Sequence, residues 1–213
     1  MINSILKHPT LYRLYQKTVR SKNSEYDFFK YIFSEISKTK KIKMLDLCSG
    51  DSFVLNYVDE YVDEYIGVDN NKKYLKKLKD KWPKFTFLNM DISNLKNANI
   101  IRDFNPNLIF MNGAIHHLDN TTMESINSFL DKYKESVFLS VDPIKENNKL
   151  LNKIMIFFDR GKFIRNKKNY HELMNSYQYC IIDDFYRMSF QNMFHFKNLN
   201  LINLYKNWKN YKA

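Results

Sequence analysis

Acidic and amide side chains recur at the ends of short apolar runs in the first half of the chain. Asp69, Asp91 and Asn112 each follow such a run, and Asp46 lies inside an earlier one. Short apolar runs bounded by polar residues indicate buried strands, and strands that alternate with helices form a parallel sheet. Because ligands bind beyond the carboxyl ends of the strands in open α/β sheets, we expect these side chains to meet at one ligand-binding edge.

The segment 43–51 predicts the turn that would face this ligand. An apolar run ends at Leu47, small residues follow at 48–50, and a helix is expected to begin near Phe53. A strand, a tight turn and a helix N-terminus together bring backbone N–H groups close to a ligand. Only Gly50 is a glycine, so the segment is a weaker signal than a full G-x-G-x-x-G, and an ordinary strand-to-helix turn is the alternative.

Four ordered motifs resemble those of the class I S-adenosylmethionine-dependent methyltransferases. In chain order they read L-D-L-C-S-G-D-S, Y-I-G-V-D-N, F-L-N-M-D-I and N-L-I-F-M-N-G-A-I-H-H-L, and the resemblance spans residues 43–142. A second resemblance, to type 11 and type 12 bacterial small-molecule methyltransferases of polysaccharide or secondary-metabolite pathways, is carried by V-D-P at 141–143, D-R-G-K-F-I-R at 159–165, and Tyr170.

The resemblance implies S-adenosylmethionine as the cofactor and S-adenosylhomocysteine as its product. It implies that Asp69 binds the ribose hydroxyls, and that Asp91 and Ile92 contact the adenine. The methionine end would lie near Asp46. The full set of expected cofactor-binding residues is Asp46, Cys48, Gly50, Asp69, Asn70, Asp91, Ile92 and Asn112. The acids also have structural alternatives, because Asp69 and Asp91 could cap helices and Asp46 could accept hydrogen bonds from backbone N–H groups.

Two residues depart from the glycine-rich first motif of the resembled family. Cys48 and Ser52 stand where that motif has glycines. Each carries a Cβ atom, which makes a positive φ angle costly. We therefore expect a reshaped turn or a lowered cofactor affinity, and a non-catalytic protein that retains the fold is an alternative function.

The catalytic candidates are His117, His116 and Asp142, which follow the fourth and fifth expected strands. Methyl transfer is expected to be an in-line displacement, in which the protein mainly positions and desolvates the reactants. One histidine could act as a general base if the nucleophile is a hydroxyl. The alternative is packing with a backbone hydrogen bond. Adjacent histidines are a poor chelating pair, so no metal site is expected.

The substrate is expected to be a small molecule, with an anionic sugar, nucleotide-sugar or metabolite as options. Arg160 and Arg165 could bind an anion through their planar guanidinium groups, and Tyr170 could form a substrate wall. Tyr12 and Tyr15 could belong to a lid from the N-terminal helices. The alternatives are tyrosines that pack in the core and a solvated basic loop around the arginines.

Composition limits the classes of protein that fit. The chain has 213 residues, a formal net charge of +11 and two cysteines, so neither a disulfide scaffold nor a zinc site is expected. No apolar run is long enough to span a bilayer and no signal-peptide pattern is present, so we expect a cytoplasmic protein. The charge keeps a nucleic-acid methyltransferase as a rival, although the lysines are spread along the chain rather than clustered.

The expected architecture is one α/β domain at 41–213 preceded by a helical cap at 1–40. The resemblance implies a Rossmann-like, doubly wound sheet of seven strands, mostly parallel, with a C-terminal antiparallel hairpin. Helices are predicted at 9–20 and 24–36. The last two strands are predicted at 181–186 and 194–205, followed by a polar, frayed tail at 206–213.

Overall fold

The computed structural model describes residues 25–97, 99–145, 156, 161–183, 185 and 191–212. The predicted helix at 9–20, with Tyr12 and Tyr15, lies outside these residues, as does Arg160. Residues 25–37 of the expected cap form helix α3 (Glu25–Ser37), close to the predicted helix at 24–36. No helix within the described ranges is long and apolar enough to cross a membrane.

Seven strands form one mixed sheet in the order β3-β2-β1-β4-β5-β7-β6. Their bounds are β1 (Ile42–Leu47), β2 (Val62–Asp69), β3 (Thr86–Asn89), β4 (Leu108–Asn112), β5 (Val137–Pro143), β6 (Gln178–Ile182) and β7 (Asn192–Lys197). The pairings among β1 to β5 are parallel, and β7 runs antiparallel to both β5 and β6. The predicted doubly wound sheet with a C-terminal antiparallel hairpin is confirmed.

The strand order reverses between β1 and β4. The carboxyl ends of these two strands are therefore the topological switch point of the sheet. β1 lies between β2 and β4, with Asp46 opposite Gly67 on one side and Phe110 on the other. The carboxyl ends of the parallel strands therefore bring residues after 47, 69, 89 and 112 to one edge. The expected cofactor residues lie at or just beyond these four strand ends, except Asp46, which lies inside β1.

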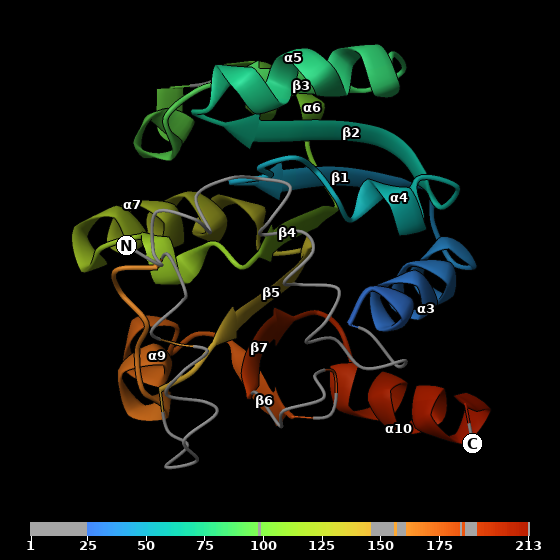
Figure 1. Cartoon of the computed structure of the whole chain (residues 1–213), viewed down its shortest axis with the longest axis vertical. Coiled ribbons are helices and arrows are strands. Elements are labelled where there is room, and N and C mark those ends of the chain that lie inside the picture. The colour runs from blue at the N-terminus through green and yellow to red at the C-terminus, as the bar shows by residue number, and fades with distance from the viewer. Residues whose placement is uncertain are drawn as a thin grey trace, which may run out of the picture.

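Helices cover both faces of the sheet (Figure 1). On one face, α3, α4 (Leu55–Val58), α5 (Lys72–Lys81) and α10 (Leu201–Lys212) contribute to one hydrophobic cluster. On the other face, α6 (Asn99–Phe104), α7 (Asn120–Leu130) and α9 (Lys167–Leu173) contribute to a second cluster. Three short 3-10 helices complete the described elements: η1 (Ile92–Asn97), η2 (Ile115–His117) and η3 (Asp131–Tyr133).

The C-terminal predictions need correction. The strand predicted at 194–205 ends at Lys197 and helix α10 begins at Leu201, because Asn198 adopts a left-handed φ of 56° between them. The Asn198 side chain fixes this reversal by donating to the carbonyls of Lys134 and Ser136, at 2.7 and 3.0 Å. The tail predicted to fray is helical as far as Lys212.

Burial explains why the end of the chain is ordered. Trp208 is only 1% exposed and its ring centroid lies 5.2 Å from that of Phe28 in α3. Leu201 and Trp208 are seven residues apart, so they lie on the same face of a helix. The prediction of a strand up to residue 205 did not take this spacing into account. The other hairpin strand, predicted at 181–186, lies earlier in the chain, as β6 at Gln178–Ile182.

Candidate active site

The turn after β1 has three residues with positive φ angles, although only one of them is a glycine. The φ angles are 57° at Cys48, 54° at Gly50 and 45° at Ser52. Left-handed conformations cost a residue with a Cβ atom roughly 1–2 kcal/mol, so neighbouring contacts must hold the turn in place. Two backbone bonds do so: Ser49 N donates to Val68 O at 3.0 Å and Ser52 N donates to Ser49 O at 2.7 Å.

Asp69 links this turn to the end of β2. Its Oδ2 accepts from Gly50 N at 2.9 Å and its Oδ1 accepts from Asn71 N at 2.8 Å. Helix α5 is capped by the side chain of Asn71, which accepts from Lys73 N at 3.1 Å, rather than by Asp69. Each carboxylate oxygen has a second lone pair, so Asp69 retains acceptor capacity for a ligand hydroxyl. Its neighbour Asn70 is exposed.

The turn has room for a ligand in front of it. Among the described residues, a Cβ atom built on Gly50 would meet nothing within 4 Å. The same edge carries the end of β3, because Met90 N and Asn89 Nδ2 both donate to Asp69 O at 3.1 Å. Half-buried Asn112 ends β4. These residues therefore lie around the switch point in the way that the motifs predict.

Asp46 lies below the turn in a polar network that the sequence did not reveal. Asp46 is 3% exposed, and its Oδ2 accepts from the hydroxyl of Tyr65 at 2.7 Å. The same hydroxyl lies 2.9 Å from Ser52 Oγ. Burial raises the pKa of Asp46 to about 7, although the Tyr65 hydrogen bond opposes this rise. The partner of Asp46 is thus a side chain on β2, rather than the backbone N–H groups considered as its alternative.

Gly67 provides space for this network. A Cβ atom at Gly67 would lie 2.8 Å from Tyr65 Cε1 and 3.0 Å from Ser49 Oγ. The ring of Tyr65 therefore crosses the backbone of its own strand only because residue 67 is a glycine. The spacing Y-x-G in the second motif is the one sequence signal that could have indicated the contact.

Asp91 directly precedes η1, which begins at Ile92 beside this edge. Exposed Asp91 accepts from Ser93 N at 2.9 Å and from Ser93 Oγ at 2.6 Å, both through Oδ1, and these hydrogen bonds lower its pKa. Asp91 therefore has the capping role that was its structural alternative. Ile92 is buried in the hydrophobic cluster on the α7 face. A contact of either residue with adenine stays a prediction.

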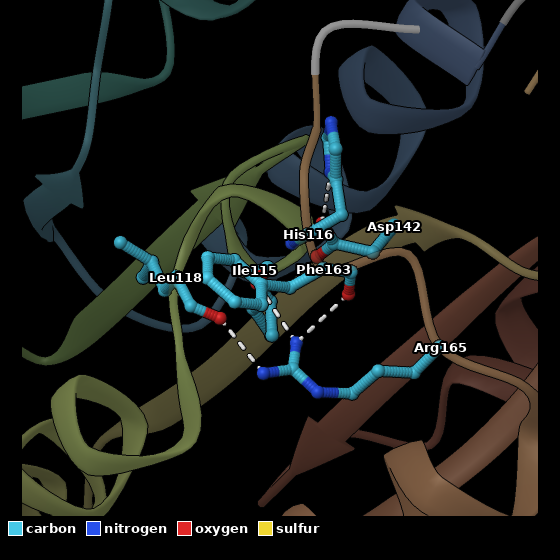
Figure 2. Close-up of polar contacts among 6 residues, drawn as sticks. All are labelled: Ile115, His116, Leu118, Asp142, Phe163 and Arg165. Carbon is cyan, nitrogen blue, oxygen red and sulfur yellow. Dashed lines mark hydrogen bonds and ion pairs between the residues drawn. The ribbon is translucent and has the colours of Figure 1, made fainter. Parts of the chain in front are cut away.

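The catalytic candidates separate into a buried pair and an exposed neighbour. His116 is 5% exposed, and Asp142 Oδ1 lies 3.0 Å from its backbone N and 2.7 Å from its Nδ1 (Figure 2). Because Oδ1 accepts from the backbone N–H, we assign it as the acceptor of the ring contact too, which places the proton on Nδ1 and makes Nε2 the basic nitrogen. His117 is exposed, with its ring centroid 4.1 Å from that of His116.

Two expected substrate residues are buried instead of facing solvent. Arg165 is 8% exposed, and its guanidinium group donates to the carbonyls of Ile115, Leu118 and Phe163 and to Asn120 Oδ1. Tyr170 is fully buried in the cluster on the α7 face. The solvated basic loop considered as an alternative is therefore incorrect for Arg165. A contact of Arg165 or Tyr170 with substrate stays a prediction, and Arg165 already has five internal hydrogen bonds.

No protein-family model matches the chain, and no curated protein is similar to it in sequence. Solved structures do match. The plantazolicin methyltransferase BpumL, in complex with a triazolic desmethylPZN analog and S-adenosylhomocysteine, has a TM-score of 0.60 and 14% identity, over 82% of this chain and 84% of that chain.

Two further structures have the same arrangement. The methyltransferase domain of bacterial CtHen1 has a TM-score of 0.56 and 14% identity, over 81% of this chain and 97% of that chain. Human N-acetylserotonin methyltransferase, in complex with S-adenosylmethionine, has a TM-score of 0.57 and 11% identity, over 80% of this chain and 51% of that chain. The protein has the fold of the class I S-adenosylmethionine-dependent methyltransferases.

Proposed function

We propose that the protein is an S-adenosylmethionine-dependent methyltransferase that methylates a hydroxyl group of a small molecule. The observation that carries this proposal is the 2.7 Å contact between His116 Nδ1 and Asp142 Oδ1 at the carboxyl edge of the sheet. An imidazole oriented by a carboxylate can act as a general base, and a base helps most when the nucleophile is a hydroxyl that must lose its proton.

The residues at the switch point fit the cofactor. The open space in front of Gly50 would accept the ligand, and Asp69 would accept hydrogen bonds from ribose hydroxyls while it holds the turn. Asn112 would lie near the amino-acid end. When bound, S-adenosylmethionine supplies a methyl group on a sulfonium, which is already activated toward nucleophiles. The protein is left with positioning, exclusion of water and proton transfer.

The residues of the β4–β5 edge would carry out the proton transfer. His116 would take the acceptor's proton at Nε2, and Asp142 would stabilise the resulting imidazolium through Nδ1. Such positioned proton transfer typically contributes 10²–10⁴-fold to a rate. Exposed His117, next to this ring, would contact the acceptor rather than act as the base. Arg160 remains the candidate cation for an anionic group on the acceptor.

The net charge of +11 supports a nucleic-acid acceptor as the second candidate. One experiment separates the two. Purified protein is incubated with S-adenosylmethionine and with hydroxyl-bearing sugars and acids, simple amines, or RNA, and formation of S-adenosylhomocysteine is measured. We expect turnover with the hydroxyl-bearing sugars and acids, and we expect His116→Asn to lose it. Turnover only with RNA, with salt-sensitive binding, would replace the small-molecule proposal. Turnover only with amines would remove the need for a base.

A further inference from the structure

We propose that residues 161–165, anchored by Arg165, position the His116 base, an inference that rests on the proposed function. Arg165 stands in a basic run that suggests anion binding, yet its guanidinium group is directed into the protein (Figure 2). Because its five N–H donors have partners within the protein, the residue would serve the site through another residue. Arg165 is thus a positioning residue.

The guanidinium group spans the turn that carries His116. Its Nη1 donates to Ile115 O and Phe163 O, both at 3.1 Å, and its Nη2 donates to Leu118 O at 2.7 Å. Asn120 Oδ1 accepts from Nη2 at 2.8 Å and from Nε at 3.3 Å. Ile115 and Leu118 are the residues on either side of the two histidines. One planar group therefore fixes both ends of η2 and ties them to Phe163.

The same segment also contacts His116 directly. Phe163 N donates to His116 O at 2.9 Å. A Cβ atom on Gly161 would lie 2.0 Å from His116 Cδ2 and 2.8 Å from His116 O, so the glycine backbone lies directly against the imidazole. Segment 161–165 thus holds the carbonyl of His116 and one side of its ring, whereas Asp142 holds its backbone N and Nδ1.

Arginine suits this task better than lysine. Five N–H donors in a rigid plane can reach several carbonyls at once, whereas an ammonium is a point charge with three donors. Burial raises the cost of losing the group, since carbonyls of Ile115, Leu118 and Phe163 would be left without this donor. A general base must be held close to its productive geometry, so a looser η2 would weaken His116 as a base even with Asp142 present.

Nuclear magnetic resonance of the protein alone tests this inference without an acceptor. The protein has five histidines, so the ring signals of His116 are assigned in ¹⁵N-histidine-labelled protein with His116→Asn as the reference. In the wild type we expect a proton on Nδ1. In Arg165→Gln we expect that signal to disappear or its exchange with solvent to accelerate about tenfold, as loss of a charge-assisted bond shifts a local opening equilibrium.

Matched variants make the result specific. Arg165→Lys is expected to restore part of the signal. Arg102→Gln is the control, because Arg102 is a surface arginine with 73% of its side chain exposed, and it should leave the His116 signal unchanged. Gly161→Ala places a methyl group against Cδ2 of the His116 ring, whereas Asp142 contacts Nδ1. We expect it to displace the ring and so to abolish the Nδ1 proton signal. Circular dichroism reports whether each variant is folded.

The outcomes distinguish this inference from the proposed function. A folded Arg165→Gln protein with an unchanged His116 signal would overturn the positioning role and leave the His116–Asp142 pair in place. A wild type that lacks a proton on Nδ1 would instead remove the pair itself, and the proposed base with it. If Arg165→Gln does not fold, Arg165→Lys and Gly161→Ala decide the question, and unchanged signals in both would overturn the inference.

Discussion

The two halves of the carboxyl edge are held by different kinds of contact. Around the β1–β2 turn, Asp69 reaches Gly50 and Tyr65 reaches Asp46, both across 19 residues of sequence between adjacent strands. At the β4–β5 edge, Asp142 reaches His116 across 26 residues, and Arg165 reaches Ile115 across 50. The first half is an assembly of neighbouring motifs, whereas the second depends on a distant segment of chain.

This difference suggests a division of tasks. The β1–β2 half offers open space and carboxylate acceptors, which suits a cofactor shared by many proteins of this fold. The β4–β5 half offers an oriented imidazole, whose surroundings come from residues 161–165, about 50 residues further along the chain. Changes in residues 161–165 would therefore alter turnover through the His116 base, while cofactor binding would not change.

The largest expected effect is a loss of turnover without a loss of cofactor affinity. Replacing His116 with asparagine removes the proposed base, so turnover with a hydroxyl acceptor should fall by about 10²–10⁴-fold. Affinity for S-adenosylhomocysteine should stay unchanged, because the cofactor half is intact. Steady-state kinetics and calorimetry on the same preparation measure both. His117→Asn is the matched control, and an equal loss in that variant would contradict the assignment of the base to His116.

The second effect concerns stability in the cofactor half. The folded-state pKa of Asp46 is about 7, above its ordinary value of 3.8. Between these pH values the folded protein therefore holds a proton on Asp46 that the unfolded chain has lost. Its stabilising contribution is present below pH 3.8 and is lost as the pH rises through about 7, which amounts to about 4 kcal/mol. Asp46→Asn should therefore lose less stability between pH 4 and 8 than wild type in urea titrations. Parallel pH profiles would refute this.

The opposite sign is expected from a buried histidine in the other half. His195 on β7 is fully buried, and burial lowers its pKa from 6.5 to about 4. Its contribution to stability is present above pH 6.5 and is lost as the pH falls toward 4, by about 3 kcal/mol. His195→Gln should flatten the acid side of the urea stability profile. The exposed His117→Gln serves as control, because His171 contributes to the lowered pKa of His195, and if the control has the same effect as His195→Gln, the assignment fails.

The sequence predicted the first half of this edge better than the second, for physical reasons. Asp46, Asp69 and Asn112 end or interrupt apolar runs, so their places follow from strand order alone. A basic run does not reveal whether a guanidinium meets solvent or carbonyls, and this is why Arg165 was expected to bind an anion. The strand predicted at 194–205 was extended too far because aromatic residues favour strands, and 206–213 was expected to fray because it is polar. Burial of Trp208 decides for the helix in both.

The most direct test of the central claim is calorimetric titration of the protein with S-adenosylhomocysteine, with NAD as a comparison ligand. Saturable binding of S-adenosylhomocysteine and none of NAD is predicted. Asp69→Ala should weaken that binding by about 10- to 100-fold, since hydrogen bonds to a charged group are lost, while the exposed Asp80→Ala should not. No binding by the wild type, or unchanged affinity in Asp69→Ala, would contradict the cofactor site described here.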